Sequence, residues 1–133
     1  MTTHFPISYT FGKKNETIVL PIITRHFQKE IKEYTDKWSK YDFYDDEYDY
    51  ELKSRTNKYK TYPTTMITAN KVSGNKKKIF LFYFTDGLYY IEYNKEIFDN
   101  YELKMVSRSG LEAPKPHFLI PIEDLIEIKT HII

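Results

Sequence analysis

Hydrophobic residues first recur at the spacing of a helix. At intervals of about three or four residues, one helical face would carry Ile18, Ile22, Ile23, Phe27, Ile31 and Tyr34. With Asn15 as N-cap and Glu16 in the first turn, this pattern predicts a helix over about residues 15–34. Pro21 lies inside this segment and removes one backbone hydrogen bond, so we expect the helix to be kinked or to begin later.

Aromatic and acidic residues then interleave over residues 41–56. The acidic run at residues 45–47, between two stretches of strand-forming residues, predicts a β-hairpin. On its second strand the even-numbered residues 48–52 are apolar or aromatic, while the odd-numbered residues 49–53 are charged. Because side chains alternate along a strand, we expect one packed face and one charged face.

The same kind of pattern predicts the later elements. Residues 79–84 and 88–93, joined by Asp86-Gly87, predict a second hairpin, whose first strand is apolar throughout and therefore buried on both faces. We further expect a short helix at residues 63–69, a solvated basic loop at 73–78, strands at 103–107 and 117–120, and a helical turn at 121–125.

Length and composition indicate one globular domain over residues 1–133. With 41% hydrophobic residues and only 4 Gly and 6 Pro, the chain is neither disordered nor collagen-like. Cysteine is absent, which excludes disulfide scaffolds, thiolate metal sites and cysteine nucleophiles.

The N-terminus and the apolar runs indicate where the protein acts. No run reaches the length of a membrane span, and the first four residues do not begin a signal peptide. We expect no membrane partner and an intracellular location: the cytoplasm, or the nucleus or a viral factory if the protein is viral in a eukaryotic host. The composition, rich in Lys, Asn and Tyr, suits a phage or viral origin.

Missing motifs exclude several kinds of chemistry. The chain has no Gly-rich phosphate loop and no GxSxG elbow. We interpret the scattered histidines as surface or structural residues, namely His4, His26, His117 and His131. The net charge is only +1, so a nucleic acid would have to be recognised by a local patch.

The remaining chemistry rests on carboxylates and lysines. On a strand, Glu-x-Lys places both side chains on one face, about 7 Å apart. With a further aspartate, the carboxylates can hold Mg²⁺ while the lysine orients or deprotonates a water that attacks a phosphodiester. The triplet occurs four times, at residues 30–32, 51–53, 102–104 and 127–129.

Context separates these four triplets. Residues 30–32 fall within the predicted helix, where positions two apart point to different sides, and residues 127–129 have no later strand to support them. The triplet at Glu102 and Lys104, with two aspartates upstream, stays open as an alternative. We favour residues 51–53, because the first hairpin brings Asp42 beside Glu51.

Three features follow one another along the chain: Glu16 on the leading helix, Lys-Tyr-Asp-Phe at residues 40–43, and Tyr-Glu-Leu-Lys-Ser-Arg at residues 50–55. This combination resembles the PD-(D/E)XK nuclease superfamily, with Tyr41 in place of the proline. The resemblance covers most of the chain and includes the later helical segment and paired strands, although the motif-specific residues are few.

The resemblance implies an α/β fold: a single restriction-endonuclease-like domain with a central mixed β-sheet flanked by helices. It implies that Asp42 and Glu51 are catalytic metal ligands, that Lys53 is the catalytic lysine and that Glu16 is a further metal ligand. The cofactor would be Mg²⁺ or Mn²⁺, and the activity that of an endodeoxyribonuclease on duplex or branched DNA. A homodimer would cut both strands most easily. If the hairpin register differs, the first acidic residue of the motif would be Asp45, Asp46 or Asp49 instead of Asp42.

Basic and aromatic residues follow the expected site directly. Such residues hold phosphates and stack on bases. We expect nucleic-acid contacts from Arg55, Lys58, Tyr59, Lys60, Tyr62 and Lys71.

Other functions stay open at this point. Glu51 and Lys53 can form an ordinary ion pair on one face of a strand. The chain would then be a non-catalytic nucleic-acid-binding or interaction module with a nuclease-like fold, or a protein-binding domain that uses exposed aromatic residues. RNA also remains open as the nucleic acid.

Overall fold

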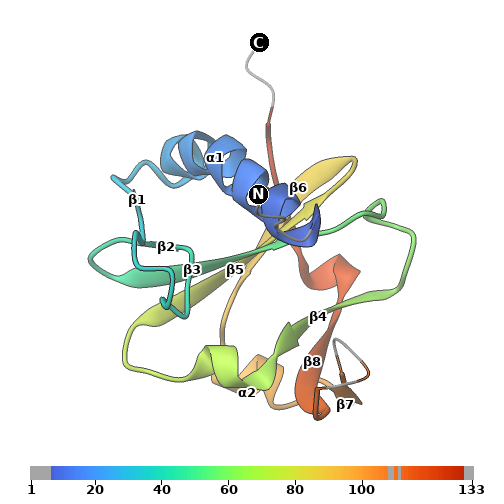
Figure 1. The fold of residues 1–133 in the computed structure, drawn as a ribbon. Helices are drawn as coiled ribbons and strands as arrows, with labels where there is room; N and C mark the ends of the chain where they lie inside the picture. Colours follow the sequence, from blue (N-terminus) through green and yellow to red (C-terminus); the bar gives the residue numbers. More distant parts are fainter. Residues whose placement is uncertain (1–6, 108–109, 111, 131–133) are drawn as a thin grey trace, which may run out of the picture.

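The computed structural model describes residues 7–107, 110 and 112–130. It has a mixed α/β fold in which a six-stranded sheet lies between the long helix α1 (Ile7–Phe27) and a second, three-stranded sheet (Figure 1). In pairing order the larger sheet contains β1 (Lys32–Glu33), β2 (Phe43–Tyr44), β3 (Tyr48–Ser54), β5 (Lys77–Phe84), β6 (Gly87–Glu92) and β9 (Ile126–Ile128). The smaller sheet contains β4 (Thr64–Thr68), β8 (Lys115–Pro121) and β7 (Leu103–Val106). Short helical segments are η1 (Ala69–Val72), α2 (Lys95–Phe98) and η2 (Ile122–Asp124).

Strand β5 joins the two halves of the core. Ile79 and Leu81 pack in the cluster under α1, while Phe80 and Phe82 pack in the cluster that includes the smaller sheet. Burial of this strand on both faces is therefore confirmed. The mixed sheet is confirmed: the long helix α1 covers one face, and the smaller sheet with the single-turn helix α2 covers the other.

The first helix exists, but its predicted bounds are wrong. Asn15 is a buried residue in the middle of α1, not an N-cap, and the helix continues through Pro21 on its exposed side. It ends before Gln28, whose φ of 54° is a left-handed conformation that a right-handed helix cannot continue through. Ile31 therefore reaches the core from the segment after the helix.

The segment at residues 63–69, predicted as a short helix, is mostly strand β4. Its buried residues are Thr65 and Ile67, which alternate with less buried neighbours in the period of a strand. Lys78, predicted in a solvated loop, lies in β5 and is 2% exposed.

Two rival Glu-x-Lys triplets also lie in unexpected elements. Residues 30–32 follow α1 and lead into β1, so they are not helical. Glu127 lies in β9, which pairs with β6 and thus has the sheet support that we did not expect. The two predicted hairpins, the strands near residues 103–107 and 117–120, and the turn near 121–125 are confirmed.

The connection from β3 to β5 covers one side of the candidate site. These strands are parallel, and the chain between them passes through β4 and η1 on the face opposite α1. The connection brings Lys71 of η1 back to Glu51 of β3. Asp49 and Glu51 on the expected charged face are consequently buried, at 7% and 6% exposed.

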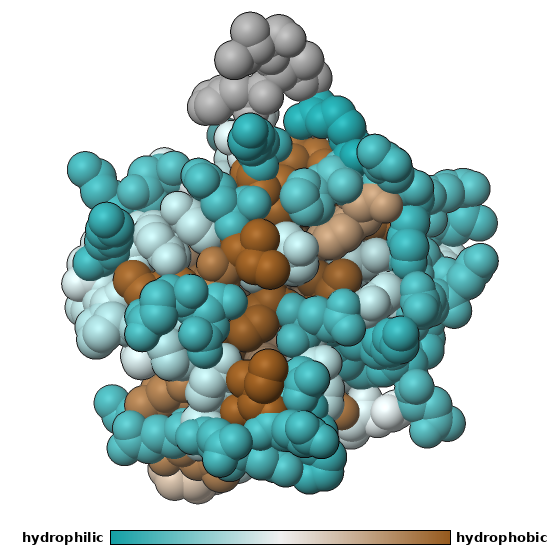
Figure 2. Space-filling view, turned by 180° about the vertical axis from the view of Figure 1, so that it is seen from behind, coloured by the Kyte–Doolittle hydropathy of each residue, from teal (hydrophilic) through white to brown (hydrophobic). Residues whose placement is uncertain are grey.

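The outer surface is mixed in character. In the part of the chain that is described, no helix is both long and apolar enough to cross a membrane. Figure 2 shows apolar residues on the back of the molecule as an interrupted band among hydrophilic ones. Exposed apolar side chains include Leu103 and Met105 on β7 and Ile126 on β9. The homodimer stays a prediction.

Candidate active site

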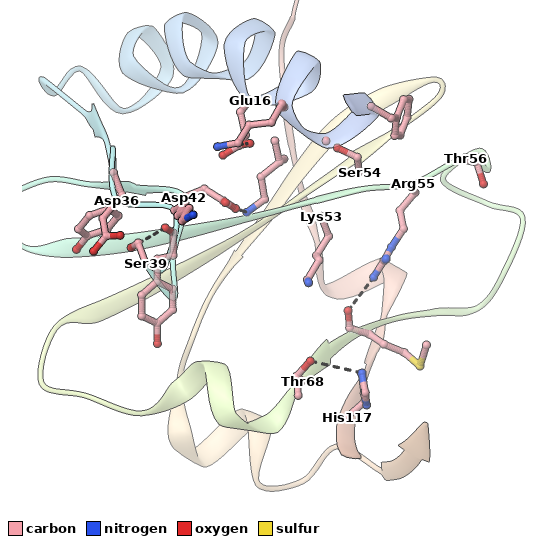
Figure 3. Close-up of a pocket in the computed structure, with 18 of the residues that line it drawn as sticks. Glu16, Asp36, Ser39, Asp42, Lys53, Ser54, Arg55, Thr56, Thr68 and His117 are labelled. Carbon is pink, nitrogen blue, oxygen red and sulfur yellow. Dashed lines mark hydrogen bonds and ion pairs between the residues drawn. The ribbon is translucent and has the colours of Figure 1, made fainter. Parts of the chain in front are cut away.

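A cleft of about 800 Å³ lies between α1, the end of β3 and the smaller sheet. Glu16 approaches from α1 and Asp42 from the loop before β2 (Figure 3). Lys53 points from β3 toward the smaller sheet, where Thr68 and His117 form the opposite wall. The cleft thus gathers charged and polar side chains from elements that are distant in the sequence.

Glu16 is positioned by the packing of α1. Val19 and Ile23, on the following turns, lie in the core and fix the helix against the sheet. The Glu16 carboxylate is mostly buried, and its Oε2 lies 3.5 Å from Lys13 Nζ. Burial, together with the negative charge of Asp42, raises the pKa of Glu16 to about 7.

Asp42 is positioned by its pairing with β3. Its backbone N–H donates to the Tyr50 carbonyl at 2.9 Å, and its Oδ2 accepts the Leu52 N–H at 2.7 Å. These bonds hold the carboxylate close to Glu51, the residue between those two partners. The negative charge of Asp42 adds to burial in raising the pKa of both Glu16 and Glu51. Asp42 is therefore the acidic neighbour that the two glutamates share.

Glu51 is the most deeply buried of the three. It lies beside Phe80 in the register of β3 and β5. Burial, and then the charge of Asp42, raise the pKa of Glu51 to about 8. Lys71 Nζ forms an ion pair with Glu51 Oε2 at 2.5 Å, and this buried oxygen has no hydrogen-bond partner.

Lys53 follows Glu51 by two residues on the same face of β3. It sits beside Phe82 in register, is partly buried and lines the cleft. Its positive charge lowers the pKa of Glu51, which opposes the effect of burial. The ammonium group is therefore close enough to act electrostatically at the acidic cluster.

The three carboxylates fit a divalent cation in their chemistry. Mg²⁺ and Mn²⁺ prefer hard oxygen donors, and burial raises the pKa values of Glu16 and Glu51. Within residues 7–107, 110 and 112–130, no group of three or more His, Asp or Glu side chains that could hold a metal ion is found, so metal binding would require these side chains to move. Binding through Glu51 Oε2 would displace Lys71.

The other candidate first acids have different roles. Asp45 caps the hairpin turn, where it accepts the N–H groups of Glu47 and Tyr48. Asp46 is exposed in that turn. Asp49 accepts a 2.5 Å hydrogen bond from the Tyr34 hydroxyl and is paired with lysines of the β5 region. Of these four aspartates, Asp42 lines the cleft. The rival triplet at Glu102 and Lys104 is exposed and does not line it.

The expected nucleic-acid residues do not form one strip. Arg55 lines the cleft, but its guanidinium donates to the Met66 carbonyl at 2.8 Å. Tyr59 stacks on Tyr89 at 4.0 Å. Other expected contacts are exposed outside the cleft lining, namely Lys58, Lys60 and Tyr62. Lys71 is committed to Glu51.

His117 is the cleft residue that the sequence pattern missed. It lies in β8 and is 8% exposed. Its Nδ1 lies 2.8 Å from the Lys115 carbonyl and its Nε2 lies 3.5 Å from Thr68 Oγ1. No spacing motif links it to Glu51, because only the packing of the smaller sheet brings the two strands to one cleft.

No protein-family model, curated protein or solved structure matches this chain.

Proposed function

We propose that this protein is a metal-dependent nuclease that hydrolyses DNA phosphodiester bonds on a restriction-endonuclease-like core. Asp42 carries the proposal, because it neighbours both Glu16 and Glu51 and lines the same cleft as Glu16 and Lys53, whereas Glu51 is buried behind the cleft lining. These residues come from α1, the loop before β2 and strand β3, in the order typical of the PD-(D/E)XK nucleases that the sequence resembles. Burying three acids together is costly, and a bound cation would offset that cost.

Each residue has a defined part in the proposed reaction. Asp42 and Glu51, supported by Glu16, would hold Mg²⁺ or Mn²⁺, which supplies Lewis acidity at the scissile phosphate. Lys53 would donate a hydrogen bond to the attacking water and hold it in line with the phosphorus. Burial of Glu51 beside Phe80 keeps bulk water from this side of the site.

Cations around the cleft support a nucleic-acid substrate. Lys13 and Lys37 line it together with Lys53, so a phosphate backbone would meet positive charge there. We propose an endonuclease that acts on duplex or branched DNA, and a homodimer would present two such sites to the two strands.

A second candidate is a non-catalytic nucleic-acid-binding module with the same fold. The ion pair between Lys71 and Glu51 favours it, because an ammonium already neutralises the buried carboxylate. Such a module would bind DNA in EDTA and would not need Asp42, Glu51 and Lys53 as a unit.

A cleavage assay separates the two candidates. Plasmid, linear, single-stranded and branched DNA are incubated with Mg²⁺, Mn²⁺ or EDTA, using the wild type, Glu51→Gln and Lys53→Met. We expect metal-dependent cutting that falls by about 10²-fold or more in each variant.

The rival triplet supplies matched controls, Glu102→Gln and Lys104→Met, which should cut like the wild type. If only these two control variants lost cutting, the active site would be at Glu102 and Lys104 instead. Binding in EDTA without cutting of any DNA would establish the non-catalytic module.

A further inference from the structure

His117 faces the candidate active site from the other wall of the cleft. Figure 3 shows it beside Thr68 on the smaller sheet, across the cleft from Lys53. The imidazole belongs to a strand, β8, that is paired on both sides, with β4 and with β7. Its position is therefore set by two strand ladders rather than by a mobile loop.

The two nitrogens of His117 have different neighbours. A carbonyl oxygen only accepts hydrogen bonds, so Nδ1 carries a hydrogen when it bonds the Lys115 carbonyl at 2.8 Å. The other nitrogen, Nε2, is left to gain or release a proton on the Thr68 side. Its 3.5 Å separation from Thr68 Oγ1 is at the limit of a hydrogen bond, so a substrate oxygen can replace this contact.

We propose that His117 is the general acid of the nuclease reaction and protonates the leaving oxygen of the scissile phosphodiester. This inference rests on the proposed nuclease function. Glu16 and Asp42 line the cleft on the α1 side, and His117 lines the opposite wall, toward which Lys53 points. A phosphate bound between the two walls would have its attacking water on the first side and its leaving oxygen on the second, as in-line displacement requires.

The water oxygen forms a bond to phosphorus, and the bond from phosphorus to the leaving oxygen breaks with its electron pair on that oxygen. The imidazolium of His117 gives its Nε2 proton to this oxygen and becomes neutral imidazole. The attacking water releases one proton to solvent, and solvent returns one to Nε2. No oxidant or reductant is needed.

The variant His117→Asn tests this role with little disturbance. The asparagine amide retains a donor near Nδ1 for the Lys115 carbonyl and removes Nε2. Two substrates are compared: an oligonucleotide with normal linkages, and the same oligonucleotide with the bridging oxygen replaced by sulfur, on the 3′ or the 5′ side. A thiolate leaves without needing a proton, so a general acid contributes little to its departure. The matched control is His26→Asn, an exposed histidine on α1.

We expect His117→Asn to lower kcat on the normal linkage by about 10²-fold, with little change in KM. The loss should shrink to within about threefold on the sulfur-bridged substrate. Equal losses on both substrates, or no loss on either, would overturn the proposal. If the wild type cuts neither substrate, the nuclease function fails first and this inference fails with it.

Discussion

Lys71 Nζ lies 2.5 Å from Glu51 Oε2, so the buried carboxylate expected to bind a metal is already neutralised by an ammonium group. Both side chains are well shielded, with 19% of Lys71 and 7% of Glu51 exposed. Lys71 also lies over the ring of Tyr41, in the loop that carries Asp42. Lys71 thus stands where a cation is needed and competes with any metal ion for Glu51.

Removal of this competitor should strengthen metal binding. We expect Lys71→Met to tighten the Kd for Mn²⁺ by about tenfold, the effect of removing one nearby like charge. Titration calorimetry without DNA measures this directly. Lys58→Met removes an exposed lysine outside the cleft lining and should leave the Kd unchanged. Weaker Mn²⁺ binding in Lys71→Met would show that Lys71 supports the site instead.

The raised pKa of Glu51 makes stability depend on pH. Its usual value is 4.5, and burial with the charge of Asp42 raises it to about 8 in the folded state. Between these values the folded protein holds a proton that the unfolded chain has lost, so stability falls as pH rises. Glu16, with a pKa of about 7, acts in the same direction.

In EDTA, we expect the Tm of the wild type to fall by roughly 10–20 °C between pH 5 and pH 8.5 through these two groups. Glu51→Gln cannot lose this proton and should show a smaller fall. Thermal unfolding followed by circular dichroism checks both. Identical pH profiles for the two proteins would refute the assignment of the raised pKa to Glu51.

Neighbouring lysines on β5 should differ sharply in their effect on stability. Lys78 has 2% of its side chain exposed and pairs with Asp49, whereas Lys77 has 59% exposed and pairs with the half-exposed Glu47. Lys78→Ala removes a fully buried side chain and one partner of Asp49, which keeps Lys76 and the Tyr34 hydroxyl, and should cost about 2–3 kcal/mol. Lys77→Ala should cost less than about 1 kcal/mol. Urea unfolding of the two variants measures the difference, and similar costs would contradict the buried pair.

Substitutions at Arg55 and Lys58 should have different effects, because we expect Arg55 to stabilise the fold and Lys58 to contact DNA. Arg55 joins the end of β3 to β4 through the Met66 carbonyl, so Arg55→Ala should lower stability by about 1.5–3 kcal/mol. Lys58→Ala should leave stability unchanged and, if Lys58 contacts a phosphate, reduce the salt slope of DNA binding by about 1. Unfolding curves and salt titrations distinguish these effects. Unchanged DNA affinity and salt slope in Lys58→Ala would exclude it from the interface.

The sequence predicted the strands whose hydrophobic pattern or flanking turn is visible locally. The unbroken apolar run of β5 indicated burial on both faces, and the acidic turn before Tyr48 predicted the hairpin of β2 and β3. The helix predicted at residues 63–69 is wrong, and the β-branched residues Thr64, Thr65 and Ile67 already favoured the strand that is found there. The end of α1 was missed because Gln28, not a glycine, adopts the left-handed conformation.

The sequence predicted that the first hairpin brings Asp42 beside Glu51, and the structure confirms this pairing through the bonds of Asp42 to Tyr50 and Leu52. The surroundings of this pair depend on tertiary packing. The burial of Glu51, its pairing with Lys71 and the arrival of His117 all require the smaller sheet to fold over β3 and β5. Tyr59, expected to stack on bases, instead stacks on Tyr89, a partner that no local pattern indicates.

Mn²⁺ titration of the metal-free protein tests the central claim most directly, because it needs no assumption about the substrate. The wild type should bind Mn²⁺, and Asp42→Asn should lose that binding, since Asp42 is the acidic neighbour of both Glu16 and Glu51. Glu102→Gln should bind like the wild type. Absence of Mn²⁺ binding in the wild type, or equal binding in Asp42→Asn, would contradict a metal site at these acids.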